Sequence, residues 1–83
     1  MTATDPFTLD DLAAVAISII GNRRISLRPE MTANDVPGWD SLAHTLIVME
    51  ISARRGREFR PRDLAEAADF GEVIRLINAP GDA

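Results

Sequence analysis

The chain has 83 residues, 46% of them hydrophobic and 27% charged, which is typical of one small globular domain. It contains no cysteine, so disulfides, thiolate metal sites and intrinsic thiol chemistry are excluded. All nine positively charged residues are arginines, and 13 acidic residues leave a net charge of −4, which disfavours nucleic acid as a partner. No stretch approaches the roughly 20 apolar residues of a membrane span, and residues 1–6 lack the features of a signal peptide. We therefore expect a cytoplasmic protein without a membrane partner.

Apolar periodicity predicts helices and no convincing strand, so the expected fold class is all-α. The first helix is predicted over residues 9–20, with the Thr8 hydroxyl as its N-cap and the acidic side chains of Asp10 and Asp11 in its first turn. Gly21 and Asn22 are a stop signal. The apolar stripe that we expect to face the core comprises Leu9, Leu12, Ala13, Ala16, Ile19 and Ile20.

Residues 22–40 combine proline, glycine and asparagine without a sustained period, which predicts a long loop. We expect Ile25, Leu27, Met31 and Val36 to hold this loop against the core. A second helix is predicted from Asp40–Ser41 to about Arg54, ended by Gly56. It carries more apolar residues than one face can bury, namely Leu42, Leu46, Ile47, Val48, Met49 and Ile51.

The rest of the chain predicts two more helices. A short third helix is expected from Pro61 or Asp63 to Ala68. A fourth follows with Asp69 as its cap and Glu72 three residues later, the spacing of a capping box. Residues 1–83 would form one domain with an ordered core at about 7–78 and loose tails at 1–6 and 79–83.

Side chains that could perform catalysis are scarce. His44 is the only histidine, and lysine, cysteine and tyrosine are missing. Asp40, Ser41 and His44 lie within five residues at the start of one helix, where they cannot form the nucleophile–base–orienter line of a catalytic triad. Asp40 and His44 would supply only two metal ligands, too few for a structural zinc. We therefore expect no autonomous catalysis and no metal site, with His44 as an exposed helix residue.

Ser41 stands at the start of the second predicted helix, directly after an acidic residue and a loop with Pro37 and Gly38. This position would project its hydroxyl into solvent. Unpaired backbone N–H groups and the positive end of the helix dipole would favour an attached phosphate there. Simple capping by Asp40 or Ser41 is a common alternative, and it is compatible with modification of Ser41.

The string Gly38-Trp39-Asp40-Ser41-Leu42-Ala43-His44 resembles the phosphopantetheine attachment motif of acyl and peptidyl carrier proteins, whose core signature is Asp-Ser-Leu. The resemblance extends over nearly the whole chain, because length, acidic charge, four helices and a motif at mid-chain agree with that family. It implies a right-handed, mostly antiparallel four-helix bundle like that of acyl carrier proteins, with a long loop between helices one and two and a short third helix.

The resemblance also implies roles for particular residues. Ser41 would carry a covalent 4'-phosphopantetheine arm transferred from coenzyme A by a phosphopantetheinyl transferase. Asp40 would help to position metal and phosphate during this loading. Acyl or aminoacyl groups, attached by a loading enzyme, would then travel as thioesters to downstream synthase or modifying enzymes. A chain with no cysteine of its own could hold a thioester only through such an arm.

The second helix departs from fatty-acid-type carriers, which typically present acidic side chains to their partners. After Asp40 it has one acidic residue, Glu50, and it ends in Arg54 and Arg55. This difference favours a specialised or secondary-metabolic pathway, such as polyketide or nonribosomal peptide biosynthesis. The predicted partner-binding residues are Leu42, Ala43, Leu46 and Arg54. Whether Leu46 turns into the core instead depends on the rotation of the helix.

A different class of function remains open. The chain could be a small helical adaptor that docks through Leu42 and Leu46 and never carries a prosthetic group. Such an adaptor has no need of Ser41, which this chain keeps. In either case we expect a monomer.

Overall fold

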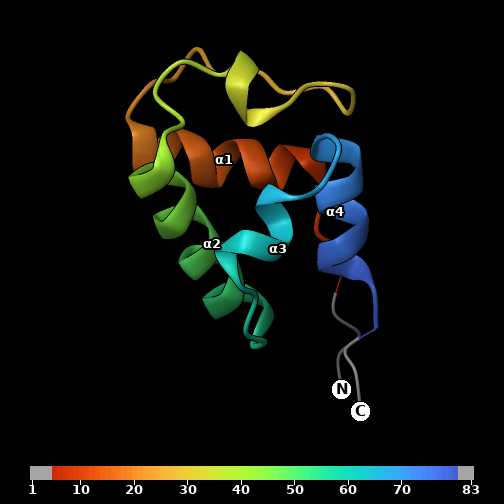
Figure 1. Cartoon of the computed structure of the whole chain (residues 1–83). Helices are drawn as coiled ribbons and strands as arrows, with labels where there is room; N and C mark the ends of the chain where they lie inside the picture. The colour runs from red at the N-terminus through yellow and green to blue at the C-terminus, as the bar shows by residue number, and fades with distance from the viewer. Residues whose placement is uncertain (1–4, 81–83) are drawn as a thin grey trace.

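The computed structural model describes residues 5–80 of the chain, and within that range every regular element is helical (Figure 1). This confirms the all-α prediction. The elements in chain order are α1 Leu9–Ile20, the 3-10 helix η1 Ala33–Asp35, α2 Ser41–Arg55, α3 Pro61–Ala65 and α4 Phe70–Asn78.

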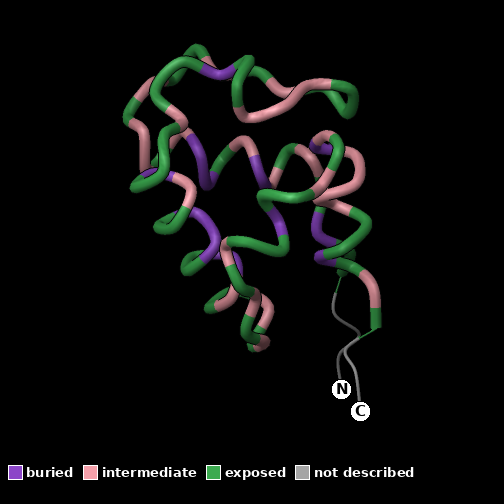
Figure 2. The backbone as a smooth tube through the Cα atoms, in the orientation of Figure 1, coloured by how far each residue is buried: buried purple, intermediate pink, exposed green. Residues whose placement is uncertain are grey.

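The four α-helices enclose one small hydrophobic core. α1 packs against both α2 and α4, the short α3 sits between α2 and α4, and the loop with η1 covers the remaining side of α1 (Figure 1). Buried segments of α1, α2 and α4 face one another across this centre (Figure 2). The core residues are Phe7, Leu12, Val15, Ala16, Val36, Ile47, Val48, Ile51, Leu64, Phe70 and Ile77.

Helix ends follow the predicted signals closely for α1 and α2. The Thr8 hydroxyl accepts from Asp11 N, and the Asp11 carboxylate accepts from Thr8 N, so the two residues form a capping box. Gly21 ends α1 in the left-handed region with φ 85°. Asp40 caps α2, and Gly56 ends it with φ 64°.

The boundary between α3 and α4 differs from the prediction. α3 ends at Ala65 rather than Ala68, because the chain must leave the helical path before Asp69 adopts its extended capping conformation. The Asp69 side chain does accept from Glu72 N. Glu72, however, accepts from Ala68 N at 2.7 Å, so its carboxylate closes the turn one residue earlier than in a standard capping box.

The long loop is held against the core as predicted. Val36 is buried, and the other three predicted anchors are half-buried against the core. Two features of this loop were not predicted from the sequence. One is η1, and the other is its backbone attachment to α4, where Phe70 N donates to Met31 O at 2.9 Å and Gly71 N donates to Pro29 O at 2.8 Å. The loop thereby supplies acceptors for two N–H groups at the α4 N-terminus that a helix leaves unpaired.

Asn78, at the end of α4, binds the chain segment before α1. Its amide oxygen accepts from Phe7 N and its amide nitrogen donates to Phe7 O, both at 2.8 Å. Arg55 donates to Asp5 O and Arg57 donates to Ala79 O. Arginine side chains therefore contact the backbone at residues 5 and 79, within the predicted tails. The other tail residues, 1–4 and 81–83, lie outside the described range.

Replacing Asn78 with Ala is expected to lower the free energy of unfolding by about 2 kcal/mol. Two part-buried hydrogen bonds to the Phe7 backbone would be lost, and each such bond contributes about 0.5–1.5 kcal/mol. Urea denaturation followed by circular dichroism would measure the change. A loss below about 0.5 kcal/mol would contradict this role of Asn78.

Candidate functional site

Ser41 is the first residue of α2, and it is exposed as predicted. Asp40, the residue before it, caps the helix because its Oδ1 accepts from Ala43 N at 2.8 Å. The Ser41 carbonyl is also engaged, accepting from the Thr45 hydroxyl at 3.1 Å. Within residues 5–80 the Ser41 hydroxyl itself forms no hydrogen bond. Its oxygen is therefore free to react or to be modified.

The backbone before Ser41 is shaped by close contact with α1. Gly38 has φ +90°, and a Cβ atom at this position would lie 2.7 Å from Ile20 Cγ2. Only glycine tolerates both conditions without strain. A short turn follows, in which Trp39 N donates to Val36 O and Asp40 N to Gly38 O. The Pro-Gly loop thus places Asp40 and Ser41 at the α2 N-terminus.

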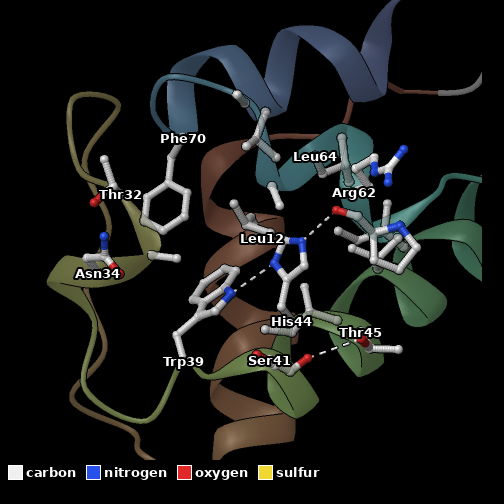
Figure 3. A pocket seen from close by; sticks show the side chains of 18 of the residues that line it. Leu12, Thr32, Asn34, Trp39, Ser41, His44, Thr45, Arg62, Leu64 and Phe70 are labelled. Carbon is white, nitrogen blue, oxygen red and sulfur yellow. Dashed lines mark hydrogen bonds between the residues drawn. The ribbon is translucent and has the colours of Figure 1, made fainter.

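A cavity of about 730 Å³ lies beside Ser41, lined by residues from all four α-helices and η1 (Figure 3). Leu12 and Leu64 form part of its apolar wall, while Trp39 and His44 lie on the Ser41 side. The Trp39 ring packs against Phe70 with centroids 5.0 Å apart. The cavity lining is therefore partly aromatic and partly aliphatic, and the exposed Ser41 is one of its residues.

His44 is not the exposed residue that the sequence predicts. It is half-buried at the cavity, where its Nδ1 accepts from Trp39 Nε1 at 3.1 Å and its Nε2 lies 2.9 Å from Pro61 O. The prediction was wrong because helical spacing alone does not show that the preceding loop places Trp39 against the first turn of α2. Within residues 5–80 no group of three or more histidine or acidic side chains is placed to hold a metal ion.

The predicted partner-binding residues divide into exposed and buried ones. Leu42 is 69% exposed and Leu46 is 41% exposed, so Leu46 does not turn into the core. Ala43 is only 7% exposed, which corrects its placement beside them: it lies one turn before Ile47 on the core side of α2. Met49 is also exposed and was not predicted as a surface residue, although the excess of apolar residues on this helix was a signal for it.

Arg54 forms an ion pair with Glu50 one turn earlier, with Nε and Oε2 2.8 Å apart. Both side chains are about half exposed, so solvent screens the pair and its contribution to stability is a few tenths of a kcal/mol. The pair balances the charge of Glu50, the one acidic residue of α2. The exposed side of α2 therefore combines the apolar Leu42, Leu46 and Met49 with polar residues and carries no net negative charge after Asp40.

One ionisable group has a clearly shifted pKa. A backbone hydrogen bond at Glu30, followed by the side-chain hydrogen bond from Arg28, lowers the pKa of this carboxyl. Glu30 is exposed in the long loop and does not line the cavity, so the shift concerns the loop and not the candidate site.

Comparisons with protein-family models, curated proteins and solved structures find no match to this chain. Among the described helices, none combines the length and apolar character needed to cross a membrane.

Proposed function

We propose that this chain is an acyl carrier protein that holds acyl or aminoacyl groups as thioesters on a 4'-phosphopantetheine arm attached to Ser41. The observation that carries the proposal is the Ser41 hydroxyl, which is exposed at the α2 N-terminus beside a cavity and forms no hydrogen bond within residues 5–80. The arm, when bound, supplies the thiol on which groups are carried. The chain itself has no thiol, so the arm would supply a functional group that the amino-acid sequence lacks.

The surroundings of Ser41 suit an attached phosphate. The N-terminus of α2 presents backbone N–H groups and the positive end of the helix dipole. Asp40 uses Oδ1 for capping, and its Oδ2 makes no hydrogen bond within residues 5–80, which leaves that oxygen to face metal and phosphate during loading. In the loading step Ser41 Oγ bonds to phosphorus, its proton passes to a base of the transferase, and the adenosine bisphosphate part of coenzyme A leaves.

The all-helical bundle is compatible with the four-helix carrier fold that the motif suggests. The proposed partners are a phosphopantetheinyl transferase, a loading enzyme and later synthase or modifying enzymes, which the monomeric chain would meet in the cytoplasm. Leu42 and Leu46 would contact them, with Arg54 at the far end of α2. This face lacks an unpaired acidic residue after Asp40, which supports a specialised pathway over housekeeping fatty-acid synthesis.

The proposal is tested by incubating the protein with coenzyme A, magnesium and a promiscuous phosphopantetheinyl transferase. Intact-mass spectrometry is expected to show one added phosphopantetheine, which fragmentation maps to Ser41. Failure of loading by several unrelated transferases would contradict the proposal. It would favour an adaptor that docks through the exposed Leu42, Leu46 and Met49 side chains.

A long-chain cargo is expected to enter the cavity beside Ser41 and to raise the melting temperature. Each methylene group removed from water contributes about 0.8 kcal/mol, so even a few buried groups would produce a measurable shift. Melting curves of the unmodified, the phosphopantetheine-loaded and the long-chain acyl forms provide the comparison. Identical midpoints for the last two forms would show that the acyl chain stays in solvent.

A further inference from the structure

His44 is held by two hydrogen bonds that together require one form of its ring. Trp39 Nε1 can only donate, so His44 Nδ1 must be the unprotonated acceptor. Pro61 O can only accept, so His44 Nε2 must carry the hydrogen. Only the neutral Nε2–H tautomer satisfies both partners. A second proton would have to be placed on Nδ1, where it would face the N–H group of Trp39.

This pair of bonds joins three parts of the candidate site (Figure 3). Trp39 is the last residue before the Asp40 cap and packs on Phe70 at the start of α4. His44 lies in the first turn of α2, and Pro61 is the first residue of α3. A helix of five residues is too short to be stable by itself, so the position of α3 depends on such contacts.

We infer that His44 is a positioning residue of the Ser41 site: its neutral Nε2–H form fixes Trp39, and through Trp39 the segment that presents Asp40 and Ser41, while it holds α3 at the cavity. The functional part of this inference rests on the proposed carrier function. Loss of the Trp39 bond would release the segment before α2. Other charged groups that line the cavity are Asp40 on the α2 side, Arg62 on α3 and Asp69 at the start of α4.

The hydrogen-bond arrangement can be tested on the unmodified protein, without any transferase. Nitrogen-15 NMR of the histidine ring distinguishes the two neutral tautomers, and we expect the Nε2–H form near pH 8. In His44→Gln the indole N–H signal of Trp39, the only tryptophan, is expected to move and to exchange faster with solvent. An Nδ1–H tautomer in the wild type, or an indole signal that is unchanged in His44→Gln, would overturn the inference.

Two variants test the effect on Ser41. Trp39→Phe removes the donor and keeps an aromatic ring against Phe70, while His44→Gln can still donate to Pro61 O and loses the ring acceptor. We expect each variant to lower kcat/KM of Ser41 loading about fivefold, which corresponds to the net free energy of one neutral hydrogen bond. Because the two residues act through the same bond, the double variant should lose no more than either single variant. Additive losses would overturn the inference.

A core variant separates positioning from a general loss of stability. Ile77→Ala removes buried apolar packing on α4 and leaves the Trp39–His44 bond in place. At a temperature where this variant remains folded, it is expected to load Ser41 like the wild type, whereas His44→Gln loses about fivefold. Equal losses for the two variants would contradict the inference. If the wild type is not loaded at all, the carrier proposal fails, whereas the NMR result still decides the hydrogen-bond arrangement.

Discussion

Replacing Ser41 with Ala is expected to abolish phosphopantetheine attachment completely and to leave the fold unchanged. The substitution removes the oxygen that the carrier proposal assigns to the phosphodiester. It disturbs little else, because the Ser41 side chain is exposed and forms no hydrogen bond within residues 5–80. Asp40 still caps α2 through Ala43 N, and the backbone carbonyl of residue 41 still accepts from Thr45. Intact mass reports the loading, and circular dichroism with a melting curve reports the fold.

Ser18→Ala is the matched control, since Ser18 is an exposed helical serine on α1. This variant should be loaded like the wild type and melt at a similar temperature. Loading of Ser41→Ala would place the attachment elsewhere and contradict the account. An unfolded Ser41→Ala variant would contradict the claim that its hydroxyl has no structural role.

Ile47→Ala is expected to cost about 2–5 kcal/mol of stability. Ile47 is 1% exposed and lies in the core on the α2 face that packs toward α1. Truncation of its side chain removes apolar contacts and leaves a void that this rigid packing only partly closes. A domain of this length has a total stability of roughly 4–12 kcal/mol, so the loss is a large fraction of the whole. Urea denaturation should show the midpoint falling sharply.

Leu42→Ala on the same helix provides the comparison, because Leu42 is 69% exposed. Its stability should change by less than about 0.5 kcal/mol, as for most surface substitutions. Equal losses for the two variants would mean that the assigned rotation of α2 is wrong. The same pair also separates a stability effect from a partner effect, since only Leu42 belongs to the proposed contact face.

Features set by neighbouring residues were predictable from the sequence. The N-caps at Thr8 and Asp40 and the glycine ends at Gly21 and Gly56 depend on chemistry within one helical turn, and the structure has all four. The exposed start of α2 at Ser41 follows from the same local signals.

Features that depend on contacts between distant segments were not predictable. The rotation of α2, which buries Ala43 and exposes Met49, is decided by packing against α1 and the core. The bonds of His44 require both the path of the loop before α2 and the position of Pro61, 17 residues away. The apolar periodicity of the sequence indicates neither the path of this loop nor the position of Pro61. The same holds for the attachment of Pro29 to Gly71, which pairs a backbone carbonyl of the long loop with an N–H group in the first turn of α4.

The carrier account is tested most directly by the intact mass of this protein isolated from the cells that naturally make it, before and after treatment with hydroxylamine. The account predicts one phosphopantetheine on Ser41, together with an additional acyl or aminoacyl mass that hydroxylamine removes, because thioesters react with this reagent and the phosphodiester does not. A chain with the unmodified mass of its sequence would contradict the account.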